Sequence, residues 1–499
     1  MAQTDKPKGR ITTVIDLVSR DSQDNYIFPS DTDQTWFSDE PYQKAHTTSN
    51  SIQEWPHKGS AEWNGKMEFV LGKIQAGDLL KDIILQFRVG HWYDATTISR
   101  LQTGGYTGID MASSAPWTYI NSLGTSIIEY AEIQVGDQTL ETLTGEFIRV
   151  FYTLYPGINE AFGLGVDAIG EGSVSELSAN TGMFSPIRPY PTDRGIYFCV
   201  LPFFFSRIRL KETLPLLSCA DKSVRIIIKF RPFSEAVRIA RSGVNRISCT
   251  DTSLGKSVTF IGTPGKTISM SDIIPSLQDV RIITHCSLLS ETLRLQYLRK
   301  PFEQLYRFVQ SFEFTEPYKY ISNKPNASKD VVNIQLPLEL NHPVQELVWV
   351  FRRKAVQINN EWSNFNPFVS SQYGADRFFP EWLGSASLRV NGMVVEQGHG
   401  NRFRYDCAQK HRGGILAWSS NVYGYSFAQY PSIHQPSGTA NMSKSHSVVL
   451  DLTVNVPFAV PVPPGFDAVV SRGWEVFVYV FYYNWLRFEN GIVNRLFSE

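Results

Sequence analysis

Asp82-Ile-Ile-Leu-Gln-Phe-Arg88 and Glu346-Leu-Val-Trp-Val-Phe-Arg352 are two versions of one stretch of sequence. Each begins with an acid, continues mainly with apolar residues and ends in Phe-Arg. A short apolar run of this kind, bounded by turn residues, predicts a buried strand. Its recurrence predicts a structural unit that is present twice in the chain.

Three further pairs of segments repeat in the same order. They are Ala131–Glu141 with Ala386–Glu396, Ser223–Ile228 with Ser447–Leu452, and Asp279–Ile283 with Glu475–Tyr479. The distance between partners shortens from pair to pair, which predicts two similar β domains, the first with longer loops. Two-residue hairpin turns are predicted at Gly136-Asp137 (type II′) and Asn391-Gly392 (type I′). Chance similarity between alternating strands is the alternative explanation.

The chain from Trp55 onward has the pattern of successive strands separated by Gly, Pro and Asn. Predicted strands include Lys66–Leu71, Asp82–Val89, Ile127–Val135, Tyr197–Phe205, Val224–Phe230 and Val280–His285. Helical periodicity is scarce: the best example, Ser290–Val309, is interrupted by Pro301, and we interpret it as a connector. In the alternating strand Val332–Leu340, Pro337 lacks a backbone donor and predicts an edge or a bulge. The predicted fold class is all-β.

The repeats divide the chain into an N-terminal arm (1–50), a first domain (51–297) and a second domain (298–499). The arm is polar and weakly patterned, and such segments become ordered only when docked on something else. Two long segments rich in Gly, Ser, Thr and Pro, Tyr155–Asp193 and Ser234–Ser271, lengthen the first domain. Loops of this length are usually functional, so we expect them on an exposed face.

Composition favours a large folded protein without direct sequence-specific binding to nucleic acid. The 499 residues are 42% hydrophobic and 13% aromatic, enough for sizeable cores. Lys and Arg (47) balance Asp and Glu (48), which gives a net charge of −1. Phosphate contacts dominate nucleic-acid binding, so a balanced charge argues against packaging of a genome.

The five cysteines are scattered and form no Cys-x-x-Cys pair, which argues against a disulfide framework or a zinc ribbon and fits a reducing compartment. The segment Met1–Arg10 is polar, so no secretory signal is predicted. The longest apolar runs, Cys199–Phe205 and Val476–Tyr483, are far shorter than the roughly 18–20 residues that a membrane helix needs.

Signatures of catalysis are weak. Gly255-Lys256-Ser257 and Gly265-Lys266-Thr267 look like the end of a phosphate-binding loop, but Thr250 and Phe260 stand where the first glycine is required. Neither Gly-x-Ser-x-Gly nor His-Glu-x-x-His occurs. No catalytic, cofactor-binding or metal-binding residue is predicted, although paired carboxylates for glycoside cleavage are not visible in a sequence.

The segment Tyr423–Leu452 contains the most specific sequence motif in the chain. Aromatic residues alternate at Tyr423, Tyr425 and Phe427 as in a strand. The following His434-Gln-Pro-Ser-Gly-Thr439 predicts a turn, because Pro436 presets φ and Gly438 tolerates positive φ. An ordinary loop between two strands is the simpler interpretation of this segment.

These motifs together resemble the double jelly-roll major capsid proteins of the nucleocytoplasmic large DNA viruses, icosahedral double-stranded DNA viruses such as phycodnaviruses and iridoviruses. The resemblance covers the chain from about residue 55 to its end. It is carried by Pro202, Phe203, Phe204, Phe205, Asn341, His342, Pro343, Gln435, Pro436, Ser437, Gly438, Thr439, Asn441, Ser443, Asn484, Leu486, Arg487 and Gly491.

The resemblance implies two consecutive eight-stranded antiparallel jelly rolls and a structural role in the viral shell. It implies a homotrimer with a pseudo-hexagonal outline, contacts with neighbouring capsomers, minor capsid and penton proteins, and a possible inner membrane under the arm. It further implies location in the virion capsid, assembly in the host cytoplasm and no cofactor. A β-sandwich carbohydrate-binding protein or glycoside hydrolase is the alternative function.

Overall fold

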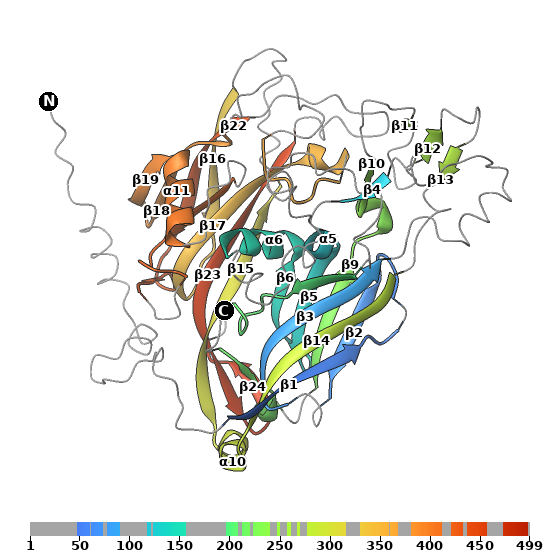
Figure 1. The fold of residues 1–499 in the computed structure, drawn as a ribbon. Coiled ribbons are helices and arrows are strands. Elements are labelled where there is room, and N and C mark those ends of the chain that lie inside the picture. Colours follow the sequence, from blue (N-terminus) through green and yellow to red (C-terminus); the bar gives the residue numbers. More distant parts are fainter. Residues whose placement is uncertain are drawn as a thin grey trace.

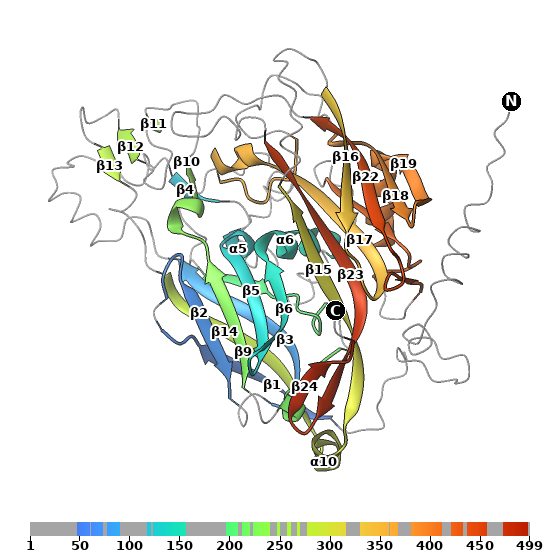
Figure 2. The ribbon, with the colours of Figure 1, turned by 180° about the vertical axis from the view of Figure 1, so that it is seen from behind.

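The computed structural model describes residues 47–59, 61–72, 77–89, 117–120, 123–155, 196–207, 212–219, 223–239, 247–249, 257–260, 267–269, 277–315, 330–358, 360–367, 381–411, 421–432, 437–456 and 473–497. Within these residues the chain forms two β-sandwiches that lie side by side (Figures 1 and 2). The fold is therefore all-β with few helices, as the strand pattern predicts.

The first sandwich consists of two antiparallel sheets. One has the order β1 (Thr47–Pro56), β14 (Leu277–Leu289), β3 (Leu79–Val89), β7 (Ile196–Val200), and β8 (Leu214–Pro215) pairs with β3. The other has the order β2 (Lys66–Leu71), β9 (Val224–Phe230), β5 (Ile128–Val135), β6 (Gln138–Thr144). Buried and less buried residues alternate along β2 and β5, as a strand with one face in the core requires.

The second sandwich repeats this order strand for strand. One sheet runs β15 (Phe302–Phe314), β23 (Trp474–Glu489), β17 (Pro343–Arg353), β20 (Val422–Ser426), with β21 (Ala440–Asn441) paired to β17 and β24 (Ile492–Arg495) paired to β23. The other runs β16 (Asp330–Leu338), β22 (Val448–Val456), β18 (Leu383–Val390), β19 (Met393–His399). The two sandwiches are thus the two consecutive jelly rolls.

The repeated segments occupy equivalent strands in the same register. Ile83 pairs with Thr284 across β3 and β14, and the corresponding Leu347 pairs with Val480 across β17 and β23. Ala131 pairs with Ile228 just as Ala386 pairs with Leu452. The internal repeat is therefore confirmed at the level of single residue pairs, which excludes chance similarity.

Even an irregularity of the ladder is repeated. The register of β5 against β6 shifts between Ile133 and Gln134, and that of β18 against β19 shifts between Leu388 and Arg389. These are matching positions of the second repeated pair, and such shifts mark β-bulges, in which one strand carries an extra residue.

Local predictions were confirmed at several turns. Gly136 has φ 64°, and Asn391 and Gly392 have φ 51° and 78°, the signs that type II′ and type I′ turns require. Pro337 lies in β16, an edge strand, as its missing backbone donor predicts. After Gly255-Lys-Ser and Gly265-Lys-Thr the chain forms short strands, β12 (Ser257–Phe260) and β13 (Thr267–Ser269), instead of a phosphate-binding helix.

Two sequence interpretations were partly wrong. Within Ser290–Val309 only α10 (Glu291–Arg299) is a connecting helix, because Pro301 ends it and β15 of the second sandwich begins at Phe302. The predicted strand Tyr197–Phe205 ends at Val200, and the Phe203–Phe205 segment forms a turn.

Each sandwich also carries a helix that the sequence pattern did not predict. Helix α6 (Gly145–Leu154) follows β6, and α11 (Gly400–Lys410) follows β19 at the equivalent place. Both helices start with a glycine whose position leaves no room for a side chain, because an added Cβ would overlap the carbonyl oxygen of Ile128 or of Leu383. This close approach fixes each helix against the first residue of a core strand.

The remaining elements are short. A small sheet is formed by β11 (Ile247–Cys249), β12 and β13, and β4 (Trp117–Tyr119) pairs with β10 (Val237–Ile239). The remaining helical turns are α5 (Leu123–Ser126), η1 (Leu216–Cys219), η2 (Phe233–Glu235) and η5 (Lys354–Ile358). The expected arm up to residue 46 and loop residues 156–195 lie outside the described residues, as does most of 240–276.

Candidate functional site, the interface between the two sandwiches

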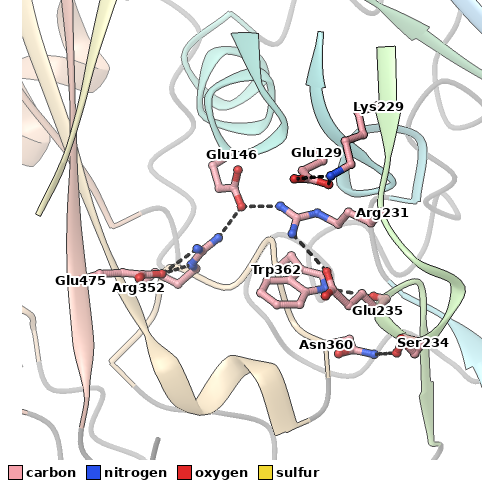
Figure 3. Close-up of polar contacts among 10 residues, drawn as sticks. All are labelled: Glu129, Glu146, Lys229, Arg231, Ser234, Glu235, Arg352, Asn360, Trp362 and Glu475. Atoms are coloured by element: carbon pink, nitrogen blue, oxygen red, sulfur yellow. Dashed lines mark hydrogen bonds and ion pairs between the residues drawn. The ribbon is translucent and has the colours of Figure 1, made fainter. Parts of the chain in front are cut away.

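A buried ion-pair network joins the two sandwiches at the start of α6 (Figure 3). The Thr144 hydroxyl caps this helix by accepting from the Phe147 N–H at 3.2 Å, which places Glu146 in the first turn. The Glu146 carboxylate accepts from Arg231 of its own sandwich at 2.5 Å and from Arg352 of the second sandwich at 2.6 Å. One carboxylate thus ties both halves of the molecule.

The second sandwich supplies the rest of the network. Arg352, near the end of β17, also donates to Glu475 of β23 at 2.7 Å. The Trp362 ring lies 4.7 Å from the Arg231 guanidinium and 5.5 Å from that of Arg352, and its indole N–H donates to the Glu235 carbonyl at 2.9 Å. Arg231 also pairs with Glu235 at 3.4 Å, so two guanidiniums share three carboxylates and one aromatic face in a site largely closed to water.

The electrostatics of Glu146 favour its charged form. Burial alone would raise the pKa of this carboxyl, but the charges of Arg352 and Arg231 outweigh it and lower the pKa to about 2. Burial acts against the Arg352 charge as well, and Glu146 and Glu475 more than offset this, so the pKa of Arg352 is raised. Glu146 and Arg352 consequently stay charged across the physiological range.

The network predicts acid sensitivity. Because the pKa of Glu146 falls from 4.5 to about 2 on folding, its stabilising effect is fully present above about pH 4.5 and is lost as pH falls toward 2. We expect Glu146→Gln to flatten this part of the stability curve. The measurement is the urea midpoint at a series of pH values from 6 to 2, and equal slopes for wild type and variant would contradict the prediction.

A second buried group of charges lies further along the same interface. Glu141 of β6 accepts from Arg207 at 2.7 Å, from the Phe204 N–H at 2.8 Å and from the Val309 N–H of β15 at 3.3 Å. Arg207 in turn donates to the Arg307 carbonyl at 2.7 Å. The first sandwich therefore binds the backbone of the strand that opens the second.

Aromatic rings fill the space between these polar groups. The Phe147 ring of α6 lies 5.2 Å from Tyr479 and 6.0 Å from Phe481, both on β23. Phe204 contacts Tyr306 and Phe308 of β15 at 4.9 and 4.8 Å. Such contacts add to apolar burial, and buried residues of both sandwiches belong to one continuous hydrophobic core.

In the Phe203–Phe205 segment, two of the phenylalanines belong to the core of the first sandwich and one belongs to the interface between the sandwiches. Phe203 and Phe205 stack on one another at 6.2 Å within the first sandwich, and Phe204 reaches β15 as described above. Pro202 is buried next to them. These residues explain structurally why three consecutive phenylalanines are tolerated here.

The structure brings Asn341-His342-Pro343 and Asn441-x-Ser443 together. Pro343 and Asn441 are paired in β17 and β21, and the His342 N–H donates to the Ser443 hydroxyl at 3.0 Å. His342 has φ 70°, and its ring stacks on Tyr482 at 5.2 Å. The two motifs thus build one tight junction rather than a metal or catalytic site.

The turn after β20 is held by Ser437 and Gly438. The Ser437 hydroxyl accepts from the Tyr430 N–H at 2.8 Å. Gly438 has φ 140°, and an added Cβ would lie 2.7 Å from the Phe427 carbonyl oxygen. Thr439 follows and leads into β21, whereas Gln435 and Pro436 lie outside the described residues. The proposed positive φ of Gly438 is confirmed.

The last group of predicted residues lies on the β23–β24 hairpin. The Asn484 side chain donates to the Phe497 carbonyl at 2.9 Å, and Leu486 is fully buried. Arg487 pairs with Glu489 at 3.0 Å on the surface, and Gly491 has φ 76° in the turn. The predicted residues thus form separate structural junctions, and their role as a family signature stays a prediction.

The three basic residues of β9 and its end are paired with acids. Lys229 contacts Glu129 at 3.0 Å, Arg225 contacts Asp137 at 3.3 Å, and Arg231 belongs to the network above. In the described ranges no group of three His, Cys, Asp or Glu side chains could hold a metal ion. None of the helices described there is both long and apolar enough to cross a membrane.

Comparison with known proteins supports the reading of the fold. A family model described as the large eukaryotic DNA virus major capsid protein matches residues 310–494, and one described as the major capsid protein N-terminus matches residues 35–261. The chain belongs to this family of double jelly-roll major capsid proteins. The family is one of structural proteins and not of enzymes.

Individual relatives of these major capsid proteins are distant. The major capsid protein of Pyramimonas orientalis virus is 25% identical over 185 residues, which cover 35% of this chain and 44% of the relative, less than half of its length. The PBCV-1 virus capsid has a TM-score of 0.58 at 16% identity, over 93% of this chain and 100% of that one. The Faustovirus major capsid protein has a TM-score of 0.57 at 13% identity, over 90% and 92%. At these identities the structural likeness shows the fold alone.

Proposed function

We propose that this chain is the building block of an icosahedral viral shell and that it acts as a homotrimer. The observation that carries the proposal is the buried interface that joins two equivalent sandwiches in one body. Three such bodies around a threefold axis present six similar wedges, which gives a pseudo-hexagonal capsomer. Hexagonal units tile a flat facet, and a threefold ring requires a heterologous interface that closes.

The division of the chain fits this role. We propose an arm at residues 1–50, a first jelly roll at 51–297 and a second at 298–499. Strand β1 begins at Thr47 and α10 spans the proposed border of the two jelly rolls. In this proposal the segments Tyr155–Asp193 and Ser234–Ser271 face outward, and the arm lies on the inner side, near minor capsid proteins, penton proteins or an inner membrane.

The size of the particle tests the proposal. The purified chain should elute at about three times 56.5 kDa and appear as hexagonal particles in negative stain. Its place is then the virion capsid, after synthesis in the host cytoplasm and without a nucleic-acid or cofactor ligand. A monomer at all concentrations would contradict a capsomer.

The arm offers a separate test. Because β1 begins at Thr47, deletion of residues 4–46 leaves the first sandwich complete. We expect this variant to form trimers as the full chain does and to fail in shell assembly. Loss of trimers, seen by size-exclusion chromatography, would overturn the assignment of the arm to the inner side.

A further inference from the structure

The equivalent helices of the two sandwiches are covered very differently. Helix α6 is buried on two faces: the Tyr152 hydroxyl donates to the Val200 carbonyl of its own sandwich, and Phe147 packs on the second sandwich. In α11 only Gly400, Phe403 and Cys407 are buried. Tyr405, the counterpart of Val150, is 53% exposed, while Val150 is 1% exposed. One face of α11 therefore lacks the cover that α6 receives.

The equivalent sheets show the complementary difference. All of β17 and nearly all of β23 are buried, because one face packs in the second sandwich and the other contacts the first. In β3 and β14 buried positions are interspersed with less buried ones, so only the inner face is closed. Among the residues that the structure describes, no second sandwich covers the outer face of the sheet β1-β14-β3-β7 as the first covers the equivalent sheet.

Hydrogen-bond register identifies the residues that correspond. Ile52 pairs with His285, which pairs with Asp82; Val309 pairs with Phe481, which pairs with Glu346. Asp82 and Glu346 open the repeated strands, so Ile52 of β1 corresponds to Val309 of β15. Val309 is half-buried against the core, whereas Ile52 is 66% exposed.

Glu141, the residue of the first sandwich that contacts Val309, also has a counterpart in the second sandwich. Glu141 pairs with Ile133, and Glu396 pairs with Leu388 at the matching place in the second sandwich. Glu141 accepts the Val309 N–H. Glu396 contacts Arg402 of α11 at 3.2 Å, beside a cavity of about 240 Å³ that Asp406, Lys410 and Tyr425 also line. The second sandwich thus carries the counterpart of the α6 and Glu141 surface, and the first sandwich carries the counterpart of the sheet that α6 and Glu141 contact.

We propose that the exposed face of α11, with Glu396, packs on the outer face of the sheet β1-β14-β3-β7 in a second copy of this chain. Glu396 of one copy then lies near Ile52 on β1 of the next, and α11 with Tyr405 lies over the neighbouring β14. Within one copy, Glu141 likewise meets β15 and α6 packs on the neighbouring β23. α11 and β1 lie on opposite sides of the molecule (Figure 1). The contact is consequently heterologous. Whether successive copies close into a ring depends on the rotation between them, which the angle between the two sandwiches determines.

This inference rests on the proposed trimer and adds the surfaces that form it. The inferred contact is more polar than the internal one, because Arg402 and Asp406 stand where α6 has Phe147 and Phe151. Ion pairs exposed at a rim are weakened by salt. Dissociation of the trimer at high salt should therefore precede separation of the two sandwiches within a copy.

Paired substitutions test the surfaces. The variant Ile52→Glu/Tyr405→Glu places a charge on each side of the contact, and we expect loss of the trimer peak with an unchanged unfolding midpoint of the monomer. The matched control is Val331→Glu/Met393→Glu, at residues that are 54% and 40% exposed elsewhere, and it should stay trimeric. In a second experiment, Ile52→Cys/Glu396→Cys should form reducible cross-links between copies, whereas Val331→Cys/Glu396→Cys should not.

The outcomes separate the two proposals. A monomeric wild-type chain would overturn both the trimer and this contact. A wild-type trimer that survives the two glutamates, or that forms no cross-link between positions 52 and 396, would overturn the inferred surfaces and leave the trimer standing. Loss of the trimer together with the specific cross-link supports the contact.

Discussion

Replacing Arg352 by methionine is expected to lower the free energy of unfolding by about 3–5 kcal/mol, as is typical when one member of a buried ion-pair group is removed. The Arg352 side chain is 9% exposed, and its loss leaves the carboxylates of Glu146 and Glu475 without the cation they share. Methionine retains much of the packing volume, so the change reports the charge. Chemical denaturation at one fixed protein concentration measures the effect.

Two comparisons make this result specific. Arg487→Met removes an arginine that is 45% exposed and paired on the surface, and it should hardly move the unfolding midpoint. Adding Glu146→Gln to Arg352→Met should recover part of the lost stability, because the amide needs no cation. An Arg352→Met variant as stable as Arg487→Met would show that the network does not hold the sandwiches together.

Gly145→Ala and Gly400→Ala should each destabilise the protein by about 1–3 kcal/mol, the usual cost of forcing atoms into a packed site. Alanine is normally favoured over glycine in a helix by about 1 kcal/mol, so the expected sign is the reverse of the helix preference. The reason is that the new Cβ would overlap the carbonyl oxygen of Ile128 or of Leu383. These oxygens belong to the backbone, so they cannot rotate away as a side chain could.

The neighbouring exposed position provides the control. Asn401→Ala adds the same residue to the same helix without a close backbone contact and should leave the unfolding midpoint nearly unchanged. The two glycine substitutions lie in different sandwiches, so their effects should add. Thermal unfolding of the two single glycine variants, the double variant Gly145→Ala/Gly400→Ala and Asn401→Ala measures this, and a stabilised Gly400→Ala would refute the packing argument.

Much of the fold could be predicted from the sequence because jelly-roll strands have a local signal. The repeated Asp82–Arg88 and Glu346–Arg352 segments become equivalent strands, and Lys66–Leu71 and Val224–Phe230 are strands over the predicted residues. Turn residues such as Asn391-Gly392 favour positive φ whatever their tertiary surroundings, and both have positive φ here. These features depend on neighbouring residues only, and so they are visible in one sequence.

The interface was not predicted, because its determinants are tertiary. Glu146 and Arg231 are far apart in sequence, and their ion pair forms only when α6 lies over the end of β9. One signal was available: Arg352 ends an apolar strand that turned out to be buried throughout, and a cation in such a place needs a partner. The helices α6 and α11 escaped notice because each is short.

The matching bulges after Ile133 and Leu388 have a consequence for the shape of the two sheets. Alternation of buried and exposed residues is common to most sheets. An extra residue at the same point of two sheets is a more specific likeness. A bulge bends its strand and increases the local twist, so the hairpins β5–β6 and β18–β19 are expected to bend at the same point.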